Sequence, residues 1–254
     1  MSLKSKSERS WAHNSTRCRL RVVGSMRIVS LVPSVTETLL SWGIEPTACT
    51  RFCEQPELAH VGGTKDPDIG AIIALHPDVV IVDREENRRE DAESLVAAGV
   101  EVVDLHVASL GDVEVEMRRL SVRLGGPNFT VATIDDVVPK AVAFVPIWRR
   151  PWMTINASTY GASLLASIGI TVSHAGAPTP YPTIETGDLL GLKADVVLLP
   201  TEPYVFGERH LSEVKELTGI NDVRIIDGKD LFWWGHRTEE ARHRLARQLA
   251  DLVF

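Results

Sequence analysis

Two stretches of 13 residues share one pattern and decide the fold. Residues 70–82 read GAIIALHPDVVIV, and residues 187–199, which lie 117 positions further on, read GDLLGLKADVVLL. Five positions are identical, and four more exchange one branched aliphatic residue for another. Each stretch predicts a short helix followed by a strand that is buried on both faces, because its apolar run does not alternate with polar residues. The repetition indicates that the chain contains two related halves.

Helical patterns and short apolar runs alternate on both sides of these stretches. We predict strands at 28–32, 79–82, 100–103, 141–147, 196–199 and 223–226. We predict helices at 34–42, 69–75, 88–98, 110–124, 159–167, 186–192, 211–217 and 238–252. Ser34 followed by Glu37 predicts a capping box at the start of the first helix. Strands that alternate with helices predict an α/β protein with parallel, helix-flanked sheets.

The two halves define the predicted domain organisation. Residues 27–124 are predicted to form an N-terminal α/β lobe, and residues 141–254 a C-terminal α/β lobe. Residues 125–140 form the connector, with room for about two helical turns at 133–138. Residues 1–26 are polar and basic, and we predict that they form a disordered extension.

The charge balance argues against a function on nucleic acid. Lys and Arg number 27 and Asp and Glu number 34 among the 254 residues, so the net charge is −7. We expect a monomer. No apolar run of signal-peptide length follows the basic N-terminus, which favours a cytoplasmic protein. A periplasmic or cell-surface location is expected instead if the native N-terminus was removed.

Motifs for catalysis are absent from the sequence. It contains no glycine-rich phosphate loop, no HExxH zinc motif and no GxSxG nucleophile elbow. Adjacent carboxylates such as Glu85 and Glu86 are more typical of a solvated face than of an acid–base pair. We therefore predict neither catalytic residues nor a catalytic cofactor.

Aromatic and polar residues gather in loops that follow the predicted strands. Six of the few aromatic residues are tryptophans. Because α/β sheets bind ligands at the carboxyl ends of their strands, these loops predict a cleft between the lobes that grips a large, flat, partly apolar ligand. The candidate ligand-binding residues are Pro33, Ser34, Phe52, Thr64, Trp148, Trp152, Tyr181, Tyr204, Trp233, Trp234 and His236.

Nine motifs resemble those of the cobalamin-binding proteins of ABC importers, a periplasmic binding protein family with a helical backbone. They are RIVSLVPSVTE at 27–37, TRFC at 50–53, VGGTK at 61–65, LHPDVV at 75–80, NRRED at 87–91, PWMT at 151–154, PTEPY at 200–204, FGERH at 206–210 and WGHRT at 234–238. The resemblance implies two Rossmann-like lobes, a helical connector and a corrinoid ligand in the cleft. It also implies that His236 is a weak candidate ligand for cobalt.

Two departures from this family bear on transport. The connector is shorter than the long helix that the family places there. The family also carries a glutamate on each lobe that binds the permease, and Gly70 and Gly187 stand at those positions. An ABC permease partner is therefore doubtful, and we expect a corrinoid-binding protein uncoupled from a permease. A haem, siderophore or metal-chelate receptor is the alternative, and an enzyme acting on a tetrapyrrole or nucleotide is the alternative from another class.

Overall fold

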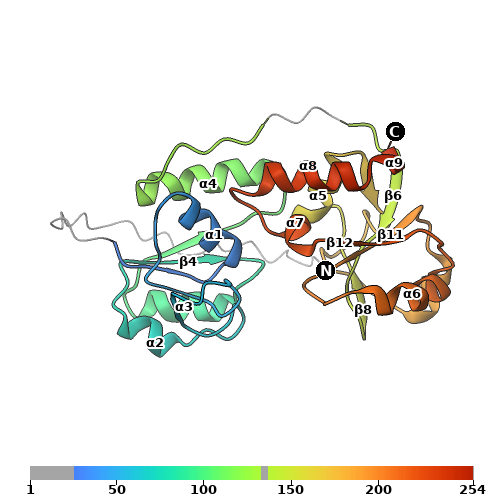
Figure 1. The fold of residues 1–254 in the computed structure, drawn as a ribbon. Coiled ribbons are helices and arrows are strands. Elements are labelled where there is room, and N and C mark those ends of the chain that lie inside the picture. The colour runs from blue at the N-terminus through green and yellow to red at the C-terminus, as the bar shows by residue number, and fades with distance from the viewer. Residues whose placement is uncertain (1–25, 133–136, 254) are drawn as a thin grey trace, which may run out of the picture.

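The computed structural model describes residues 26–132 and 137–253, which form two α/β lobes (Figure 1). Nearly all of the predicted extension at 1–26 and most of the connector helix predicted at 133–138 lie outside the described residues. None of the helices in the described segments combines the length and hydrophobicity that crossing a bilayer requires.

Five parallel strands form the sheet of the first lobe, in the order β3-β2-β1-β4-β5. Strand β1 pairs with β2 on one side and with β4 on the other, so that Val29 lies between Ala48 and Val80. The bounds of the strands are β1 (Ile28–Ser30), β2 (Ala48–Cys49), β3 (Ala59–His60), β4 (Val79–Asp83) and β5 (Val102–Leu105). The helices are α1 (Pro33–Ser41), α2 (Ile69–Ala74), α3 (Arg89–Ala97) and α4 (Leu110–Leu124).

Helices cover both faces of this sheet, which explains the unbroken apolar run of β4. Successive side chains of a strand point to opposite faces. Val80 accordingly packs in a cluster with residues of α2 and α3, whereas Ile81 packs in a cluster with residues of α1 and α4. Figure 1 shows α2 and α3 below the sheet and α4 above it.

The second lobe repeats the arrangement of the first. Its parallel sheet has the order β12-β11-β6-β9, so the repeated strand β11 lies beside β6 as β4 lies beside β1. The strands of this sheet are β6 (Ala141–Phe144), β9 (Ile170–Val172), β11 (Val196–Pro200) and β12 (Val223–Ile226). A small antiparallel sheet contains β7 (Pro146–Trp148), β8 (Trp152–Thr154) and β10 (Thr183–Ile184). The helices are α5 (Tyr160–Ala166), α6 (Leu211–Thr218), α7 (Gly228–Phe232), α8 (Thr238–Gln248) and α9 (Ala250–Val253), with 3₁₀ helices η1 (Thr186–Gly191) and η2 (Glu208–His210).

The predicted capping box at the first helix is wrong. Helix α1 begins at Pro33, its N-cap is Val32, and no side chain caps it. Proline at the first helical position has a fixed φ that suits the helix, which places Ser34 inside the first turn. Glu37 is free of a capping role and forms an ion pair with Arg237 of the second lobe instead.

Most of the predicted elements differ from the structure by one or two residues at their ends, and two differ by more. The strand predicted at 141–147 is two strands, because the chain leaves the parallel sheet after Phe144 and pairs antiparallel with β8. The helix predicted at 238–252 is interrupted at Leu249, where α8 ends before α9 begins. Strand β5 starts two residues later than predicted, whereas the helix predicted at 110–124 is confirmed.

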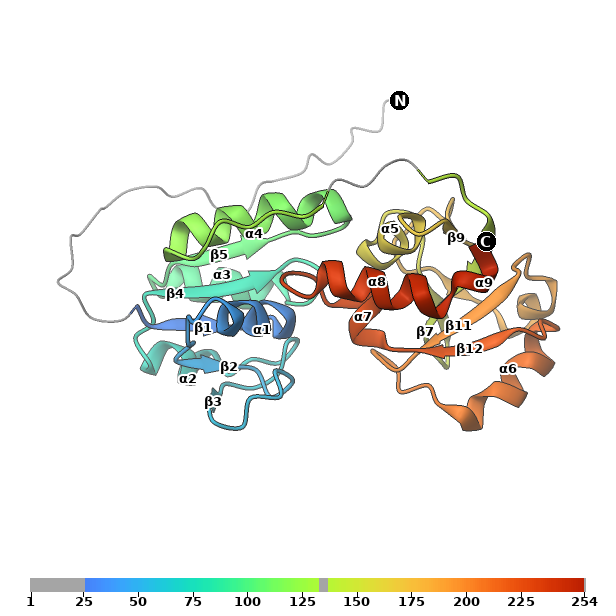
Figure 2. The same ribbon diagram turned by 45° about the horizontal axis from the view of Figure 1, so that its top comes forward.

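One continuous core joins the lobes. Met117 and Leu120 of α4 belong to the same buried cluster as Leu164 of α5 and Leu245 of α8. Figure 1 shows α4 and α8 following one another along the top of the molecule, and Figure 2 shows α8 reaching from the second lobe towards the first. The lobes are therefore packed against each other by their helices as well as linked by the connector.

The described part of the connector is not helical. Gly125 ends α4 with a φ of +72°, and the chain then runs back along α4 (Figure 1). The N–H of Val131 donates to Glu114 Oε2 at 3.1 Å, and the N–H of Ala132 donates to Glu239 Oε1 at 2.9 Å. Since Glu114 lies on α4 and Glu239 on α8, side chains of both lobes hold this segment in place.

Candidate functional site

A pocket of about 780 Å³ lies between the lobes, and loops of both lobes line it. From the first lobe come residues at or after the ends of β1, β2, β3, β4 and β5. From the second come residues of β7 and β8 and residues that follow β8, β11 and β12. The pocket thus opens at the carboxyl ends of strands of both lobes, where parallel α/β sheets bind their ligands. Its volume is typical of sites for small molecules and cofactors.

Aromatic side chains form much of the lining. They are Phe52, Trp148, Tyr160, Tyr181, Phe232, Trp233 and Trp234. Phe52 is 50% exposed and Trp148 is 44% exposed, so these two rings present open faces to the pocket region. Lys229 Nζ lies 4.8 Å from the centroid of the Trp233 ring, and Arg237 Cζ lies 5.4 Å from it. Cations near this ring help to hold it in place.

Acidic side chains outnumber basic ones around the pocket. Among the described residues that line it, the carboxylates are Glu54, Asp83, Glu85, Glu86 and Glu202, and the cations are Arg51 and Lys65. Both cations are engaged elsewhere. Arg51 donates to both carboxylate oxygens of Asp66 at 2.9 Å, and Lys65 Nζ donates to the carbonyl oxygen of Glu85 at 2.8 Å. The lining therefore offers more carboxyl groups than cations that are free to pair with a ligand.

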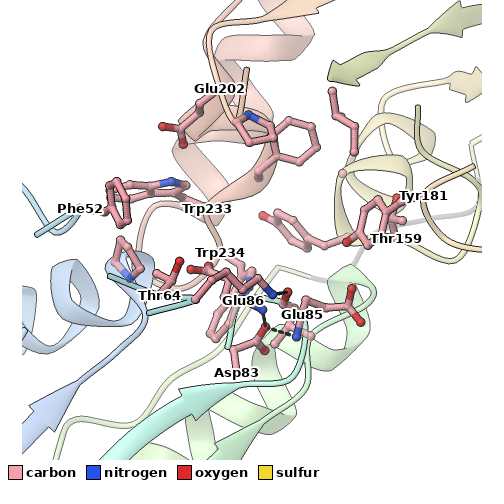
Figure 3. A pocket seen from close by; sticks show the side chains of 18 of the residues that line it. Phe52, Thr64, Asp83, Glu85, Glu86, Thr159, Tyr181, Glu202, Trp233 and Trp234 are labelled. Carbon is pink, nitrogen blue, oxygen red and sulfur yellow. Dashed lines mark hydrogen bonds between the residues drawn. The ribbon is translucent and has the colours of Figure 1, made fainter. Parts of the chain in front are cut away.

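Asp83 is the most buried of these carboxylates. It ends β4, is 1% exposed, and its Oδ1 accepts the N–H groups of Glu85 at 2.9 Å and Glu86 at 3.2 Å (Figure 3). Its Oδ2 has no hydrogen-bond partner among the described residues. Burial raises the pKa of Asp83 to about 7, although the backbone N–H groups of Glu85, Glu86 and Val107 favour the charged form.

Other groups in the pocket also favour their uncharged forms. Burial, and then the charges of Asp83 and Cys53, raise the pKa of Glu86 to about 8, whereas Lys65 lowers it. Burial also raises the pKa of Glu202, whose carboxylate is hydrogen-bonded to Trp233. The pKa of Tyr181 is raised by burial and by Glu85, to which its hydroxyl group is hydrogen-bonded. In Figure 3, Glu202 lies on the side of the pocket opposite Asp83.

The structure brings seven of the eleven predicted ligand-binding residues into the pocket lining. They are Pro33, Phe52, Thr64, Trp148, Tyr181, Trp233 and Trp234. Trp233 and Trp234 are neighbours in the chain, and both line the pocket because they lie in the bend after α7 rather than in a strand.

The other four do not line the pocket. Trp152 is buried in β8 and stacks on Phe206 at 6.2 Å, and its neighbour Met153 lines the pocket because side chains alternate along a strand. Tyr204 packs edge-on behind Trp148 at 5.6 Å. The remaining two belong to α1 and to the interlobe contact beside it.

Ser34 and His236 lie where the two lobes meet. The hydroxyl oxygen of Ser34 is buried and has no hydrogen-bond partner among the described residues. His236 donates its backbone N–H to Thr38 Oγ1 at 3.1 Å, and its Nδ1 lies 3.9 Å from Glu37 Oε2. His236 thus faces α1 of the first lobe.

Sequence reasoning missed the acidic part of the lining. It treated Glu85 and Glu86 as a solvated face, but both line the pocket, as does Glu202. The available signal was Asp83, which follows a fully apolar strand directly and stands where strand ends carry ligand groups. Across the described residues, no group of three or more His, Cys, Asp or Glu side chains is placed to hold a metal ion.

A family model described as periplasmic binding protein matches residues 28–138. The chain is therefore similar to periplasmic binding proteins over its first lobe and most of its connector. It is 19% identical over 214 residues to the vitamin B12-binding protein of Pectobacterium carotovorum subsp. carotovorum (strain PC1), covering 76% of this chain and 78% of that protein. It is 25% identical over 190 residues to the vitamin B12-binding protein of Salmonella paratyphi A (strain ATCC 9150 / SARB42), covering 68% and 71%.

Solved structures share the fold at low sequence identity. The periplasmic vitamin B12-binding protein BtuF of Vibrio cholerae has a TM-score of 0.71 and 18% identity, with 89% of this chain and 97% of that chain covered. The periplasmic haem-binding protein RhuT from Roseiflexus sp. RS-1 has a TM-score of 0.74 and 20% identity, with 91% and 100% covered. The two-lobed α/β fold predicted from the sequence is confirmed.

The named relatives bear on the broad class of function. The proteins to which the chain is similar are named as binding proteins, in agreement with the prediction of a binding protein rather than an enzyme. The similar proteins are described as periplasmic, so they do not support the preference for a cytoplasmic location. Vitamin B12-binding and haem-binding proteins are similar to the chain to comparable degrees, so the likeness by itself does not name the ligand.

Proposed function

We propose that this protein binds a cobalamin-like corrinoid in the pocket between its lobes. The observation that carries the proposal is the lining of seven aromatic side chains around a volume of about 780 Å³. Aromatic faces pack well against a large, flat, partly apolar ring. The relatives named as vitamin B12-binding proteins support this ligand class.

Haem is the second candidate, because haem-binding proteins share the fold. The electrostatics of the pocket favour the corrinoid. Haem carries two carboxylates, which would be repelled by those of the five carboxyl groups in the lining that are ionised, and both cations of the lining already have partners. A corrinoid instead carries carboxamides, which are uncharged and form hydrogen bonds with carboxylates. Like charges in a desolvated site are a strong means of rejecting a competing ligand.

Calorimetric titration with cyanocobalamin and absorption titration with haemin test the proposal. We expect saturable one-to-one binding of cyanocobalamin and at least tenfold weaker binding of haemin. Trp233→Ala should weaken cyanocobalamin binding about tenfold or more, since an aromatic contact contributes about 1 kcal/mol beyond the buried area. Trp42→Ala is the matched control, because Trp42 is also half-buried but packs on Phe129 away from the pocket. Tighter binding of haemin than of cyanocobalamin would overturn the assignment.

We further propose that the protein is not coupled to a permease through acidic side chains at positions 70 and 187. Gly70 and Gly187 are exposed, and a Cβ atom at position 187 would meet no atom within 4 Å, so packing does not require glycine there. A purified cobalamin importer in lipid nanodiscs should show little stimulation of its ATPase by this protein. The Gly70→Glu/Gly187→Glu double variant is the comparison, and strong stimulation by the unmodified protein would contradict the proposal.

A further inference from the structure

One carboxylate oxygen in the pocket wall is buried without a partner in the described part of the chain. Asp83 lines the pocket, is 1% exposed, and its Oδ2 accepts no hydrogen bond there. A buried acceptor that lacks a hydrogen bond destabilises the fold, and such atoms are rare in native proteins. Because Asp83 lines a ligand pocket, a group of the ligand is the natural donor for this atom.

The turn that carries Asp83 holds its carboxylate in place. Oδ1 accepts the N–H groups of Glu85 and Glu86, which leaves Oδ2 as the free oxygen. Asn87 braces the turn, since its Oδ1 accepts the N–H of Asp83 at 2.8 Å and its Nδ2 donates to the carbonyl oxygens of Leu31 and Thr64 at 3.1 and 3.0 Å. The acceptor is therefore preorganised before a ligand arrives.

The groups that face this turn come from several elements. Glu85 and Glu86 lie on the turn itself. The charges of three further residues shift the pKa of Glu86: Cys53 in the loop after β2, Lys65 in the loop before α2, and Glu202 in the second lobe. Tyr181 bonds to Glu85 from the second lobe. Of these, Lys65 is the cation, and its ammonium group already donates to the carbonyl oxygen of Glu85. The site thus offers acceptors to a ligand.

We propose that Asp83, with Glu86 beside it, forms a subsite that accepts the N–H of a peripheral carboxamide of the corrinoid. The inference rests on the proposed function and makes it more specific. A carboxamide supplies the N–H donor that Oδ2 lacks. Its carbonyl oxygen accepts a hydrogen bond from a protonated carboxyl group such as that of Glu86. A carboxylate at the same place on the ligand would supply no donor and would meet like charge.

Asp83→Asn is the sharpest test of the subsite. Asparagine keeps Oδ1 for the turn but puts an NH₂ group, which cannot accept, in place of Oδ2. Dicyanocobinamide should bind this variant 10- to 100-fold more weakly than the unmodified protein, the loss expected for a hydrogen bond to a charged acceptor. Asp188→Asn is the control, since Asp188 is exposed and does not line the pocket. This variant should bind dicyanocobinamide with the affinity of the unmodified protein.

A matched pair of ligands tests the chemistry of the group that is recognised. Dicyanocobyrinic acid has the corrin ring of dicyanocobinamide but carries carboxylates in place of the carboxamides. It should bind the unmodified protein at least 100-fold more weakly than dicyanocobinamide. In Asp83→Asn the ratio of the two affinities should be smaller. Calorimetry at pH 7 in two buffers that differ in ionisation enthalpy should show release of a fraction of a proton on cobinamide binding, and less release for Asp83→Asn.

The outcomes separate this inference from the proposed function. The subsite is overturned, and the corrinoid function stands, if the unmodified protein binds cobinamide and Asp83→Asn does not differ from it in three readouts. These are the affinity for cobinamide, the ratio of the affinities for the two ligands, and the proton release. If the unmodified protein binds neither cobinamide nor cyanocobalamin, both are overturned. Circular dichroism checks the fold of each variant. Should Asp83→Asn fail to fold, the two ligands are compared in Glu86→Gln instead. An unchanged ratio of their affinities in that variant counts against the subsite.

Discussion

The buried carboxylate of Asp83 predicts a measurable pH dependence of stability in the ligand-free protein. Its pKa is raised from 3.8 to about 7, because burial disfavours the charged form. A carboxyl group whose pKa is higher in the folded state than in the unfolded state makes the folded protein bind more protons. Its stabilising contribution is therefore present below about pH 3.8 and is lost as the pH rises through about 7.

The size of the effect follows from the difference in pKa. A difference of about three pH units corresponds to about 4 kcal/mol in the free energy of unfolding. Part of this loss has already occurred at pH 5, so about 3 kcal/mol remains to be lost between pH 5 and pH 8.5. Asp83→Asn removes the ionisation, and its free energy of unfolding should lack this part of the decline. Glu86, whose pKa is raised to about 8, still titrates in the variant and contributes in the same direction.

Urea unfolding monitored by tryptophan fluorescence measures this dependence. We expect the difference in free energy of unfolding between Asp83→Asn and the unmodified protein to shift in favour of the variant by about 3 kcal/mol from pH 5 to pH 8.5. Asp188→Asn controls for the general effect of removing an exposed charge. Parallel pH profiles for Asp83→Asn and the unmodified protein would refute the reasoning, because they would mean that Asp83 has an ordinary pKa in the folded state.

Three further substitutions test the packing that positions the pocket, each by urea unfolding. Gly235→Ala should destabilise the protein by about 2–4 kcal/mol, because its φ is +112° and a Cβ would lie 2.2 Å from Thr38 Oγ1; an unchanged midpoint would contradict this contact. Arg237→Gln removes a bidentate, partly buried ion pair with Glu37 at 2.8 and 3.0 Å and should cost about 1–2 kcal/mol, with the loss shrinking in high salt; no dependence on salt would count against an electrostatic origin. Leu198→Ala opens a cavity in the fully buried centre of the second sheet and should cost about 2–5 kcal/mol, whereas a loss below 1 kcal/mol would mean that the site collapses around it.

The local pattern of the sequence was sufficient for the elements that lie in the centre of each lobe. Strand β4 and helix α4 appear where their apolar runs predict them, because a continuous run and a 3.6-residue period each suit one buried geometry. The short strands β2 and β3, of which β3 lies at the edge of the sheet, were not predicted. Two residues carry no periodicity, and both strands exist only because β1 provides a partner for β2, and β2 for β3.

The candidate site was predictable as a set of loops but not as a set of side chains. Loops after strands must lie at the carboxyl edge of a parallel sheet, which explains why Phe52, Tyr181 and Trp233 line the pocket. The direction of each side chain within its loop or strand depends on pairing. Trp152 turns away from the pocket because β8 pairs with β7 and β10, and that register points Met153 inwards instead.

The sequence by itself determined a duplicated α/β chain with an aromatic ligand cleft, because hydrophobic periodicity and turn residues act over a few positions of the chain. Only the tertiary structure decided the chemistry of that cleft. Glu86 and Glu202 are 116 positions apart, yet the charge of Glu202 raises the pKa of Glu86 across the pocket. Desolvation of a carboxylate is a property of everything that surrounds it, so no local pattern in the sequence reports it.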